Sequence, residues 1–499
     1  MKNAFKQLFC LLLVFACVVL VSSCEYFPVS NPDLEYKPEQ PEQPEQPALD
    51  TVAAIVEAAS KLAADAKLEG TLKITGKVTE ITEAYTTQYK NISFKLTDGT
   101  AEILCFRCKG EAAEKLAIGD TITVTGEVQN YKGNTVEFVY AQLSDLVAEA
   151  KPVVSDKINI FGTEYATLAE ALAAAKEGDM IYVPAGTYAE EVSIAVKGVS
   201  LVGPNYTKAG AAADRAEEAV FTKKLTIAAD GVTVNGVKFL EEGNIVVAAN
   251  DATITNVYMD PTSTTVCGGG NNRKACIVDS ADVENLVVAN LTISNCYIDA
   301  PGVEESYLTE AIALNNVNGL TITGCTITNT EVATVVGSFE GIMVYNVSGV
   351  VNITNNNVLY TTDGYVIVLG YFSNACTEIN VIDNVFDGNA LNPHTATLAF
   401  RSGTEALTIN VIGNTFKNFN GSTYYVRSDT GSQIISKYNS FDANSKFKLN
   451  YHSSCTNVKQ AICESNYYAA EQTTATSDYG VIKSLEELAA AYAEYKKAN

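Results

Sequence analysis

A short pattern of hydrophobic and polar positions recurs along the second half of the chain. Each copy alternates apolar and polar residues, then turns, usually at Asn or Gly, and successive copies end 20 to 39 residues apart. Alternation is typical of β-strands, and strands this short bury an apolar face only by stacking. The pattern predicts an all-β fold, a right-handed parallel β-helix over residues 156–470. The copies lie at 232–237, 252–257, 291–296, 320–325, 351–356, 379–384, 409–414, 434–439 and 461–466.

The last five copies all end in asparagine. Residues that share one register of a β-helix lie above one another, so these amides are expected to hydrogen-bond along the axis as a ladder. The role predicted for them is structural. They are Asn356, Asn384, Asn414, Asn439 and Asn466.

Residues 51–150 have a different pattern, which predicts a small barrel. A helix is expected at 52–66, and a second one at 111–116 separates the third strand from the fourth. Five short strands with a helical segment in that place follow the order of an OB-fold, and the segment resembles the OB-like modules of bacterial secreted proteins. The expected strands are 72–78, 92–96, 101–106, 121–128 and 135–140.

The first residues have the features of a targeting signal. Two lysines precede an apolar run at 8–21, and two serines then lead to Cys24. This arrangement resembles the lipobox of bacterial lipoproteins, in which the signal is cut before the Cys and the Cys is acylated. The resemblance implies a signal peptide at 1–23 and a lipid anchor at Cys24. The alternative is an ordinary secretory signal in which the Cys stands by chance.

Residues 24–50 are expected to be a stiff spacer behind the anchor. Three Pro-Glu-Gln triplets in tandem favour an extended polyproline conformation. The anchor and spacer together resemble surface lipoproteins of the Bacteroidota, which implies attachment to the outer membrane. The cell surface is the favoured face, but the family signal usually has several acidic residues after the Cys and only Glu25 follows here, so the inner face is the open alternative. No other apolar run approaches the roughly 20 residues of a membrane-spanning helix, so lipid is the only membrane contact expected.

Composition narrows the function. The chain of 499 residues has 34 Lys+Arg and 58 Asp+Glu, a formal charge of −24, and it contains 2 His and no Trp. A nucleic-acid partner is not expected, because the phosphate backbone requires a basic surface. Two histidines leave little material for a histidine zinc site or a Ser-His-Asp triad. Any aromatic binding surface has to come from Tyr and Phe.

Both ends of the expected β-helix carry helix signals. Thr167 and Glu170 form a capping box before an Ala/Leu-rich helix, and the segment 178–188 then enters the first coil. This arrangement resembles the pectin-lyase-like superfamily. A second capping box at Ser484 and Glu487 predicts a helix that plugs or covers the last coils, within a tail at 471–499.

The resemblance covers residues 156–470 and implies fold, not chemistry. That superfamily includes polysaccharide lyases, hydrolases and esterases as well as non-catalytic glycan-binding proteins and adhesins. The Gly-His-Gly of its polygalacturonases does not occur in this chain. No catalytic residue is therefore predicted.

Acidic side chains recur at one register of the expected coils. Glu310 and Glu340 each precede an apolar strand and should lie about 5 Å apart on neighbouring coils, and Asp363 could continue the row. Such carboxylates could hold calcium or act as a glycosidase pair. The alternative is a solvated strand end with no special role.

A second set of residues suggests glycan binding. Arg401 and Arg427 stand in matching Arg-Ser pairs on successive copies, and like charges that close require an acidic or anionic partner. Tyr345, Tyr371 and Phe400 could offer rings to sugars. Because Arg binds carboxylates bidentately, the pattern favours an anionic polysaccharide such as a uronan.

Cysteines outside the signal suggest two disulfides in an oxidising envelope. Cys267 and Cys276 bracket one loop, and Cys455 and Cys463 bracket another. Each pair would restrain a loop that leaves the stack.

These observations favour a lipid-anchored envelope protein that binds a polysaccharide as an accessory component of glycan capture, with outer-membrane glycan-uptake proteins as possible partners. One alternative is a uronate-specific lyase or hydrolase of the same fold. Another is an adhesin or structural surface protein, which would bind no glycan.

Overall fold

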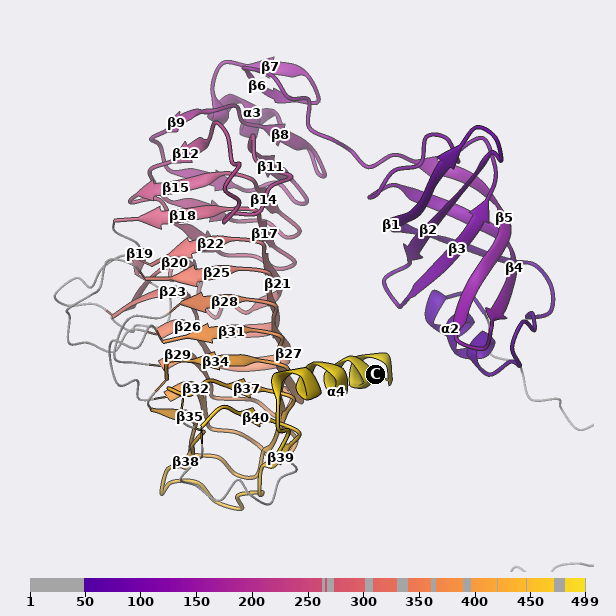
Figure 1. Ribbon diagram of the computed structural model, residues 1–499. Coiled ribbons are helices and arrows are strands. Elements are labelled where there is room, and N and C mark those ends of the chain that lie inside the picture. Colours follow the sequence, from indigo (N-terminus) through magenta and orange to yellow (C-terminus); the bar gives the residue numbers. More distant parts are fainter. Residues whose placement is uncertain are drawn as a thin grey trace, which may run out of the picture. The chain divides into compact units, whose positions relative to one another are not determined.

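The computed structural model of the chain is shown in Figure 1. Its described residues form two compact units, which divide between Glu149 and Ala150. No helix among them is long and apolar enough to cross a membrane. Cys24, Cys267 and Asp363 lie outside the described residues, and of Glu340 only the backbone is described. The described residues are 49–262, 265–266, 273–300, 308–329, 340–359, 365–388, 396–419, 421–445, 447–470 and 481–498.

The first unit is a closed five-stranded barrel, as the alternating pattern predicted. Its strands follow one another in the order β1-β2-β3-β5-β4, with β3 and β5 parallel and the other neighbours antiparallel. The inward side chains, among them Phe94 and Phe138, are fully buried. Its elements are α2 (Val52–Ser60), β1 (Leu72–Thr86), β2 (Asn91–Thr97), β3 (Glu102–Cys108), β4 (Thr121–Tyr131) and β5 (Thr135–Val147).

The helical segments of this unit are shorter than expected. The helix α2 ends at Ser60, and the segment 111–116 forms turns in place of the predicted helix. Its backbone bonds, such as Ala113 N–H to the Gly110 carbonyl, reach back three residues and not four. A segment of six residues is too short to repay the cost of nucleating an α-helix.

The second unit is a parallel β-helix of about 11 turns, which agrees with the predicted fold class. Three parallel sheets run along it (Figure 1). Sheet I contains β10 (Val192–Ile194), β13 (Leu225–Ile227), β16 (Ile245–Val247), β20 (Arg273–Asp279), β23 (Leu308–Leu314), β26 (Glu340–Tyr345), β29 (Tyr365–Gly370), β32 (Ala396–Arg401), β35 (Ser422–Arg427) and β38 (Leu449–Tyr451), with β19 (Thr265–Val266) antiparallel to β20.

Sheets II and III complete each coil. Sheet II contains β7 (Thr163–Tyr165), β6 (Ile158–Ile160), β8 (Met180–Tyr182), β11 (Ser200–Val202), β14 (Thr233–Asn235), β17 (Thr253–Thr255), β21 (Val288–Ser294), β24 (Val317–Thr323), β27 (Val347–Thr354), β30 (Glu378–Ile382), β33 (Thr408–Ile412), β36 (Gln433–Lys437) and β39 (Ile462–Glu464). Sheet III contains β9 (Gly186–Tyr188), β12 (Ala219–Phe221), β15 (Lys238–Glu241), β18 (Tyr258–Pro261), β22 (Tyr297–Asp299), β25 (Thr326–Thr328), β28 (Asn357–Leu359), β31 (Val385–Asp387), β34 (Thr415–Lys417), β37 (Ser440–Phe441) and β40 (Tyr467–Tyr468).

Equivalent side chains of successive coils stack inside the β-helix. In sheet III the rings of Phe386, Phe416, Phe441 and Tyr468 form one column, with centroids 5.3, 4.8 and 5.0 Å apart. These separations match the spacing of neighbouring strands, so the column extends the core without gaps.

The five asparagines of the predicted ladder lie between sheets II and III. Each of the first four donates its backbone N–H to the side-chain oxygen of the next, at 2.9 to 3.0 Å. Each of these side-chain amides also donates to a strand carbonyl of the preceding coil, at 2.8 to 2.9 Å. All five residues are buried, so the ladder satisfies polar groups that have no access to water.

Two helices accompany the stack. The helix α3 (Leu168–Ala174) begins at a capping box, in which Thr167 accepts the Glu170 N–H and the Glu170 carboxylate accepts the Ala166 N–H. It ends at Ala174, four residues before the segment 178–188 that was expected to enter the first coil.

The helix α4 (Leu485–Ala498) lies beside the coils and does not plug the end of the stack (Figure 1). Tyr492 stacks on Tyr438 with centroids 5.5 Å apart, and Lys496 pairs with Asp383 at 2.9 Å. A side chain at Gly413 would collide with the Tyr492 ring. The helix therefore packs on the turn row formed by Asp383, Gly413 and Tyr438, which precedes the asparagine ladder.

Candidate binding face on sheet I

Sheet I is buried on both faces in the middle coils. Its inward side chains belong to the main core, while outward ones form a second apolar cluster, here called the outer cluster. A sheet with one solvated face usually alternates apolar and polar residues along each strand. Sheet I differs from this, because its middle strands have buried apolar side chains on both faces. The outer cluster consists of Val246, Ala275, Val278, Ala313, Met343, Tyr345, Val368 and Ala399, with Tyr365 and Tyr425 against it.

Arg401 lies at the edge of the outer cluster between two tyrosines. Its guanidinium carbon is 5.3 Å from the centre of the Tyr365 ring and 5.9 Å from that of Tyr345. One of its nitrogens donates to the Tyr345 hydroxyl at 2.5 Å. Cation–π contact and a hydrogen bond together fix the orientation of the guanidinium group.

Arg427 follows Arg401 on the next coil. The two residues are register partners of the parallel strands β32 and β35, so their backbones lie about 4.8 Å apart. Arg427 is exposed, whereas Arg401 is half-buried. The Tyr345 and Tyr365 rings lie against the Arg401 side chain.

Tyr371 presents a ring at the turn that follows β29. It is 52% exposed, and its ring meets that of Tyr345 edge-on at 5.1 Å. Its φ of 54° is left-handed, a conformation that costs a residue with a Cβ about 1–2 kcal/mol. Asn346 holds the same conformation one coil earlier, with φ of 50°. Ser402 and Ser428 repeat the conformation on the next two coils, with φ of 60° and 54°, so the turn is a regular feature of this register.

Phe400 does not belong to this surface. It is 1% exposed and lies in the main core. It pairs in register with Leu369 and Val426, which also point inward, whereas its neighbour Arg401 points outward. Successive residues of a strand face opposite sides, so Phe400 cannot offer its ring to a ligand beside Arg401.

Glu310 lies on the same outer face, toward the start of its strand. Glu310 and Glu340 are register partners on β23 and β26, and Tyr365 continues their row. Glu310 is fully buried, so it is not part of a solvated strand end. Within the described parts of the chain, no group of three or more Asp, Glu, His or Cys residues could hold a metal ion.

Sequence reasoning missed three residues of this face. Tyr365 contacts Arg401, the Tyr365 and Tyr425 rings lie 5.7 Å apart, and Tyr425 meets His452 edge-on at 6.5 Å. Tyr365 lies five residues before Gly370, so alternation gave no signal for it, but Tyr425 lies two residues before Arg427. The two-residue period places such positions on one face.

The structure describes three of the four cysteines that were expected to form disulfides. Cys455 and Cys463 are both free thiols, which contradicts the predicted disulfide between them. Cys463 points into the core from β39, whereas the Cys455 thiol donates to the Val426 carbonyl at 3.3 Å. Cys276 is also a free, buried thiol, and it donates to the Asp299 carbonyl at 3.7 Å.

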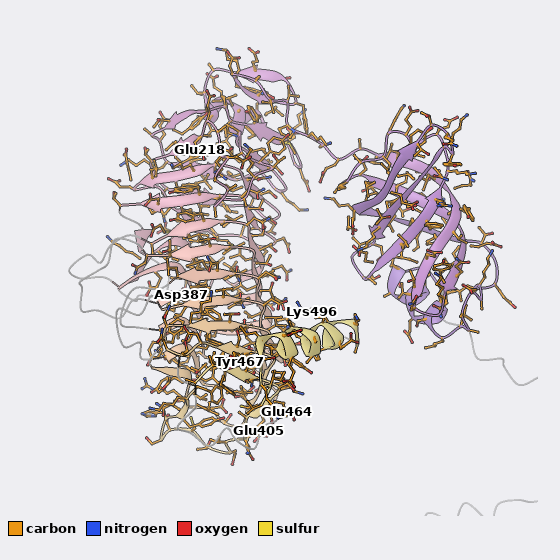
Figure 2. The ribbon with its side chains drawn as sticks, in the orientation of Figure 1. Glu218, Asp387, Glu405, Glu464, Tyr467 and Lys496 are labelled. Atoms are coloured by element: carbon orange, nitrogen blue, oxygen red, sulfur yellow. The ribbon has the colours of Figure 1, made fainter. Side chains whose placement is uncertain are left out.

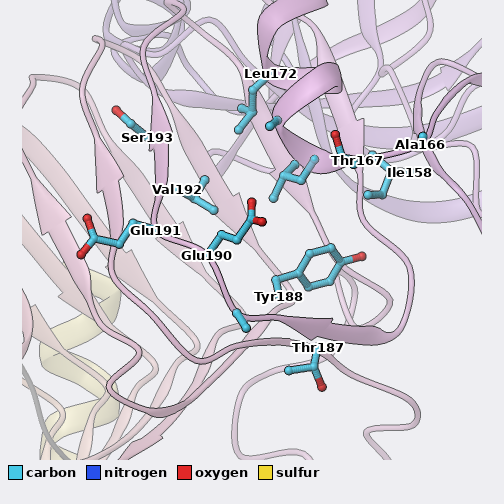
Figure 3. A pocket seen from close by; sticks show the side chains of 13 residues that line it. Ile158, Ala166, Thr167, Leu172, Thr187, Tyr188, Glu190, Glu191, Val192 and Ser193 are labelled. Atoms are coloured by element: carbon cyan, nitrogen blue, oxygen red, sulfur yellow. The ribbon is translucent and has the colours of Figure 1, made fainter.

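A cavity of about 610 Å³ lies at the other end of the β-helix, between α3 and the first coil. Figure 3 shows Tyr188 and Glu190 beside it, together with Leu172 of the helix. Its walls combine apolar side chains with Glu190 and Glu191, and it contains no Arg, Lys or His. It is therefore unsuited to an anionic ligand.

The barrel has an aromatic surface of its own. The rings of Phe106 and Tyr140 lie 6.2 Å apart, and the Arg107 guanidinium lies 4.8 Å above Phe106. Arg107 also faces Glu83, at 3.7 Å. The acid offsets the charge of the only arginine in this unit.

Comparisons with known proteins bear on the fold. Residues 72–146 match the family described as OB-fold nucleic acid binding domain. No curated protein matches the chain. A mutant of the PL6 family alginate lyase AlyGC is similar at 12% identity with a TM-score of 0.29, over 64% of this chain and 56% of that one. The match therefore spans little more than half of that lyase.

Two further solved structures resemble the chain. One is GH136 lacto-N-biosidase from Eubacterium ramulus, at 10% identity and a TM-score of 0.22, over 61% of this chain and 62% of that one. The other is the A-module of mannuronan C-5 epimerase AlgE6 from Azotobacter vinelandii, at 12% identity and 0.19, over 61% and 93%. Likeness at this level carries no argument about chemistry.

Proposed function

We propose that the protein is a lipid-anchored envelope protein whose sheet I binds an anionic polysaccharide as an accessory component of glycan capture. The observation that carries the proposal is the row in which Arg401 and Arg427 occupy neighbouring coils beside exposed Tyr371. The proposal concerns recognition and assigns no catalytic residue.

The side chains of this row suit a carboxylated sugar chain. Arg427 is exposed and can bind a carboxylate through two parallel N–H bonds. Arg401 is held in one orientation by Tyr345 and Tyr365, so less entropy is lost when a ligand binds there. The Tyr371 ring supplies an apolar face with a hydroxyl at its edge, which fits the mixed surface of a pyranose.

Charge also supports an anionic ligand. The chain has a net charge of −24, so most of its surface repels polyanions. Two arginines on adjacent coils add positive charge to this part of an otherwise acidic protein. This arrangement favours a ligand whose carboxylates repeat along its length, because each coil can then meet one of them.

Cleavage of the same glycan is the second candidate function. The observation that favours it is the register pair Glu310 and Glu340 of the same sheet, about 4.8 Å apart at the backbone. Retaining glycosidases use two carboxyl groups about 5–5.5 Å apart, which acidic residues on neighbouring coils could supply. The appearance of reducing ends or unsaturated products would identify this activity.

The test is retention of purified protein in gels that contain polygalacturonate, alginate or a neutral glucan. Wild type is expected to be retained by the uronans and to pass the neutral gel. Arg427→Ala should raise the dissociation constant at least about tenfold, because a charged hydrogen bond contributes about 1.5–3 kcal/mol. Arg401→Gln should act similarly, and Tyr371→Asn should weaken binding while leaving stability equal or slightly higher.

The matched control is Lys176→Ala combined with Lys417→Ala, which removes two exposed charges far from sheet I. It should bind as wild type does. Equal retention of wild type and Arg427→Ala, or retention by the neutral glucan alone, would overturn the assignment. Failure of every gel to retain wild type would favour an adhesive or structural role.

For the barrel we infer no nucleic-acid partner, although its family is named for that activity. Residues 51–150 contain 14 acidic and 10 basic residues, a net charge of −4. Single-strand binding by OB-folds relies on a positively charged groove. A role in spacing the β-helix from the membrane, or in contacting an outer-membrane glycan-uptake protein, is compatible with this charge.

A further inference from the structure

A row of oxygen-bearing side chains crosses three coils on the outer face of sheet III. Met259 and Ile298 are register partners that point into the core, so the residues that follow them, Asp260 and Asp299, point outward together. Thr328 is the register partner of Asp299 on the next coil. Figure 2 labels Glu218, which directly precedes β12, and Asp387 at the end of β31, on coils before and after these three.

Two tyrosines and a lysine lie beside the two carboxylates. The Tyr297 hydroxyl donates to Asp299 at 3.5 Å, and the Tyr258 and Tyr297 rings stack with centroids 4.7 Å apart. The Lys238 ammonium lies 4.4 Å above the Tyr258 ring.

Thr328 adds an independent sign of a ligand. It is 4% exposed, and its hydroxyl oxygen has no hydrogen-bond partner. A buried hydroxyl without a partner costs about 1–3 kcal/mol, and native proteins keep few of them. This hydroxyl points from the same face as the Asp299 carboxylate, one coil away.

We propose that Asp299 and Thr328 ligate a divalent cation, Ca²⁺ in preference to Mg²⁺, and that Asp260 supplies the second negative charge directly or through a water. The ligands are oxygens, which hard cations prefer. Strands of neighbouring coils lie about 4.8 Å apart, so side chains that project from the same face of both can ligate one Ca²⁺ ion, which sits about 2.3–2.6 Å from each ligand. Mg²⁺ requires a near-ideal octahedral shell at about 2.0–2.1 Å, which side chains from separate coils meet less easily.

This site is distinct from the proposed glycan-binding face. It lies on sheet III, whereas Glu310, Glu340 and the arginine row lie on sheet I. A cation held here would link three consecutive coils. The inference does not rest on polysaccharide binding, and either proposal can fail alone.

Tb³⁺ luminescence provides the first test, because tyrosine rings transfer energy to a nearby Tb³⁺ and the chain has no Trp. Tyr258 and Tyr297 stack 4.7 Å apart beside the acids, so wild type should sensitise Tb³⁺. Ca²⁺ should displace the Tb³⁺ and raise the thermal unfolding midpoint. Asp260→Asn and Thr328→Val should each lower the apparent affinity for both ions at least about tenfold.

Thr328→Val separates a ligand from a packing defect. Without Ca²⁺ this variant should be more stable than wild type, since it removes a buried hydroxyl without a partner, yet it should lose the increase in melting temperature that Ca²⁺ gives. The matched control is Asp387→Asn, which removes a carboxylate of the same sheet three coils away. It should bind as wild type does. Wild type that neither sensitises Tb³⁺ nor gains stability from Ca²⁺, or variants that bind equally well, would overturn the proposal.

Discussion

Asp279 shows how folding changes the chemistry of one residue. It ends β20 with 2% exposure, and its carboxylate accepts the Asn315 N–H at 3.2 Å. Burial raises its pKa to about 6, and the backbone hydrogen bonds only partly oppose this. The native protein therefore binds a proton at Asp279 more tightly than the unfolded chain does.

A pH-dependent loss of stability follows from this shift. The contribution of Asp279 is fully present below its ordinary pKa of 3.8 and is lost as pH rises through about 6. Asp279→Asn keeps the size and the acceptor but cannot ionise. At pH 7 it should be more stable than wild type by up to about 3 kcal/mol, and at pH 4 the difference should be small. Urea unfolding across this range measures it, and a difference that grows toward low pH would contradict it.

Individual residues were harder to predict than their pattern. The repeat placed Arg401 and Arg427 on neighbouring coils, and the structure has them in register. The choice of Phe400 as a second outward residue conflicted with strand alternation, which allows only one of two adjacent residues to face out. The burial of Glu310 could not be read from its own coil, because it depends on what covers the outer face of sheet I.

The asparagine ladder is the clearest result at the level of elements. Asn414 accepts from the Asn384 N–H and side chain, and donates to Asn439 and to the Val381 carbonyl, all within 3.0 Å. The period of the sequence predicted the stack, since register alone brings these residues together. The helix expected at 111–116 does not form. The helix propensity of its residues was outweighed by the shortness of the segment.

Removal of one asparagine from the ladder should lower the stability of the protein. Asn414→Ala leaves buried backbone and amide groups on both neighbouring coils without partners, so we expect a loss of at least about 3 kcal/mol in the free energy of unfolding. The matched control is Asn410→Ala in the same coil, whose amide bonds Asn380 at a half-buried position. It should cost less than about 1 kcal/mol. Equal losses in denaturant unfolding would show that the ladder is not a special source of stability.

At the scale of the whole molecule, the sequence predicted two folded units of different type, and both are present. Disulfides were the weakest inference at this scale. Sequence proximity of Cys455 and Cys463 says nothing about direction, and the coil places one thiol in the core and the other against β35. Loop length alone does not show whether two cysteines can meet.

Anchoring remains a prediction that concerns the whole molecule. Cys24→Ala should abolish incorporation of a labelled fatty acid and release the protein from membranes, because the acyl chains would be its only membrane contact. Fractionation with metabolic labelling measures both effects. Cys17→Ala, which removes a cysteine inside the apolar run, is the control and should leave both unchanged. Persistent labelling of Cys24→Ala would contradict the lipobox assignment.

The lateral position of α4 has a consequence for how the β-helix comes apart. A stacked array frays from its ends, because the outermost coil has a neighbour on one side only. Here Lys496 returns to Asp383, 113 residues earlier in the chain, and Tyr492 to Tyr438. While the helix is docked, the coils between those contacts cannot unfold one at a time. Unfolding of these coils therefore has to begin with the release of α4, and it should then involve several coils at once.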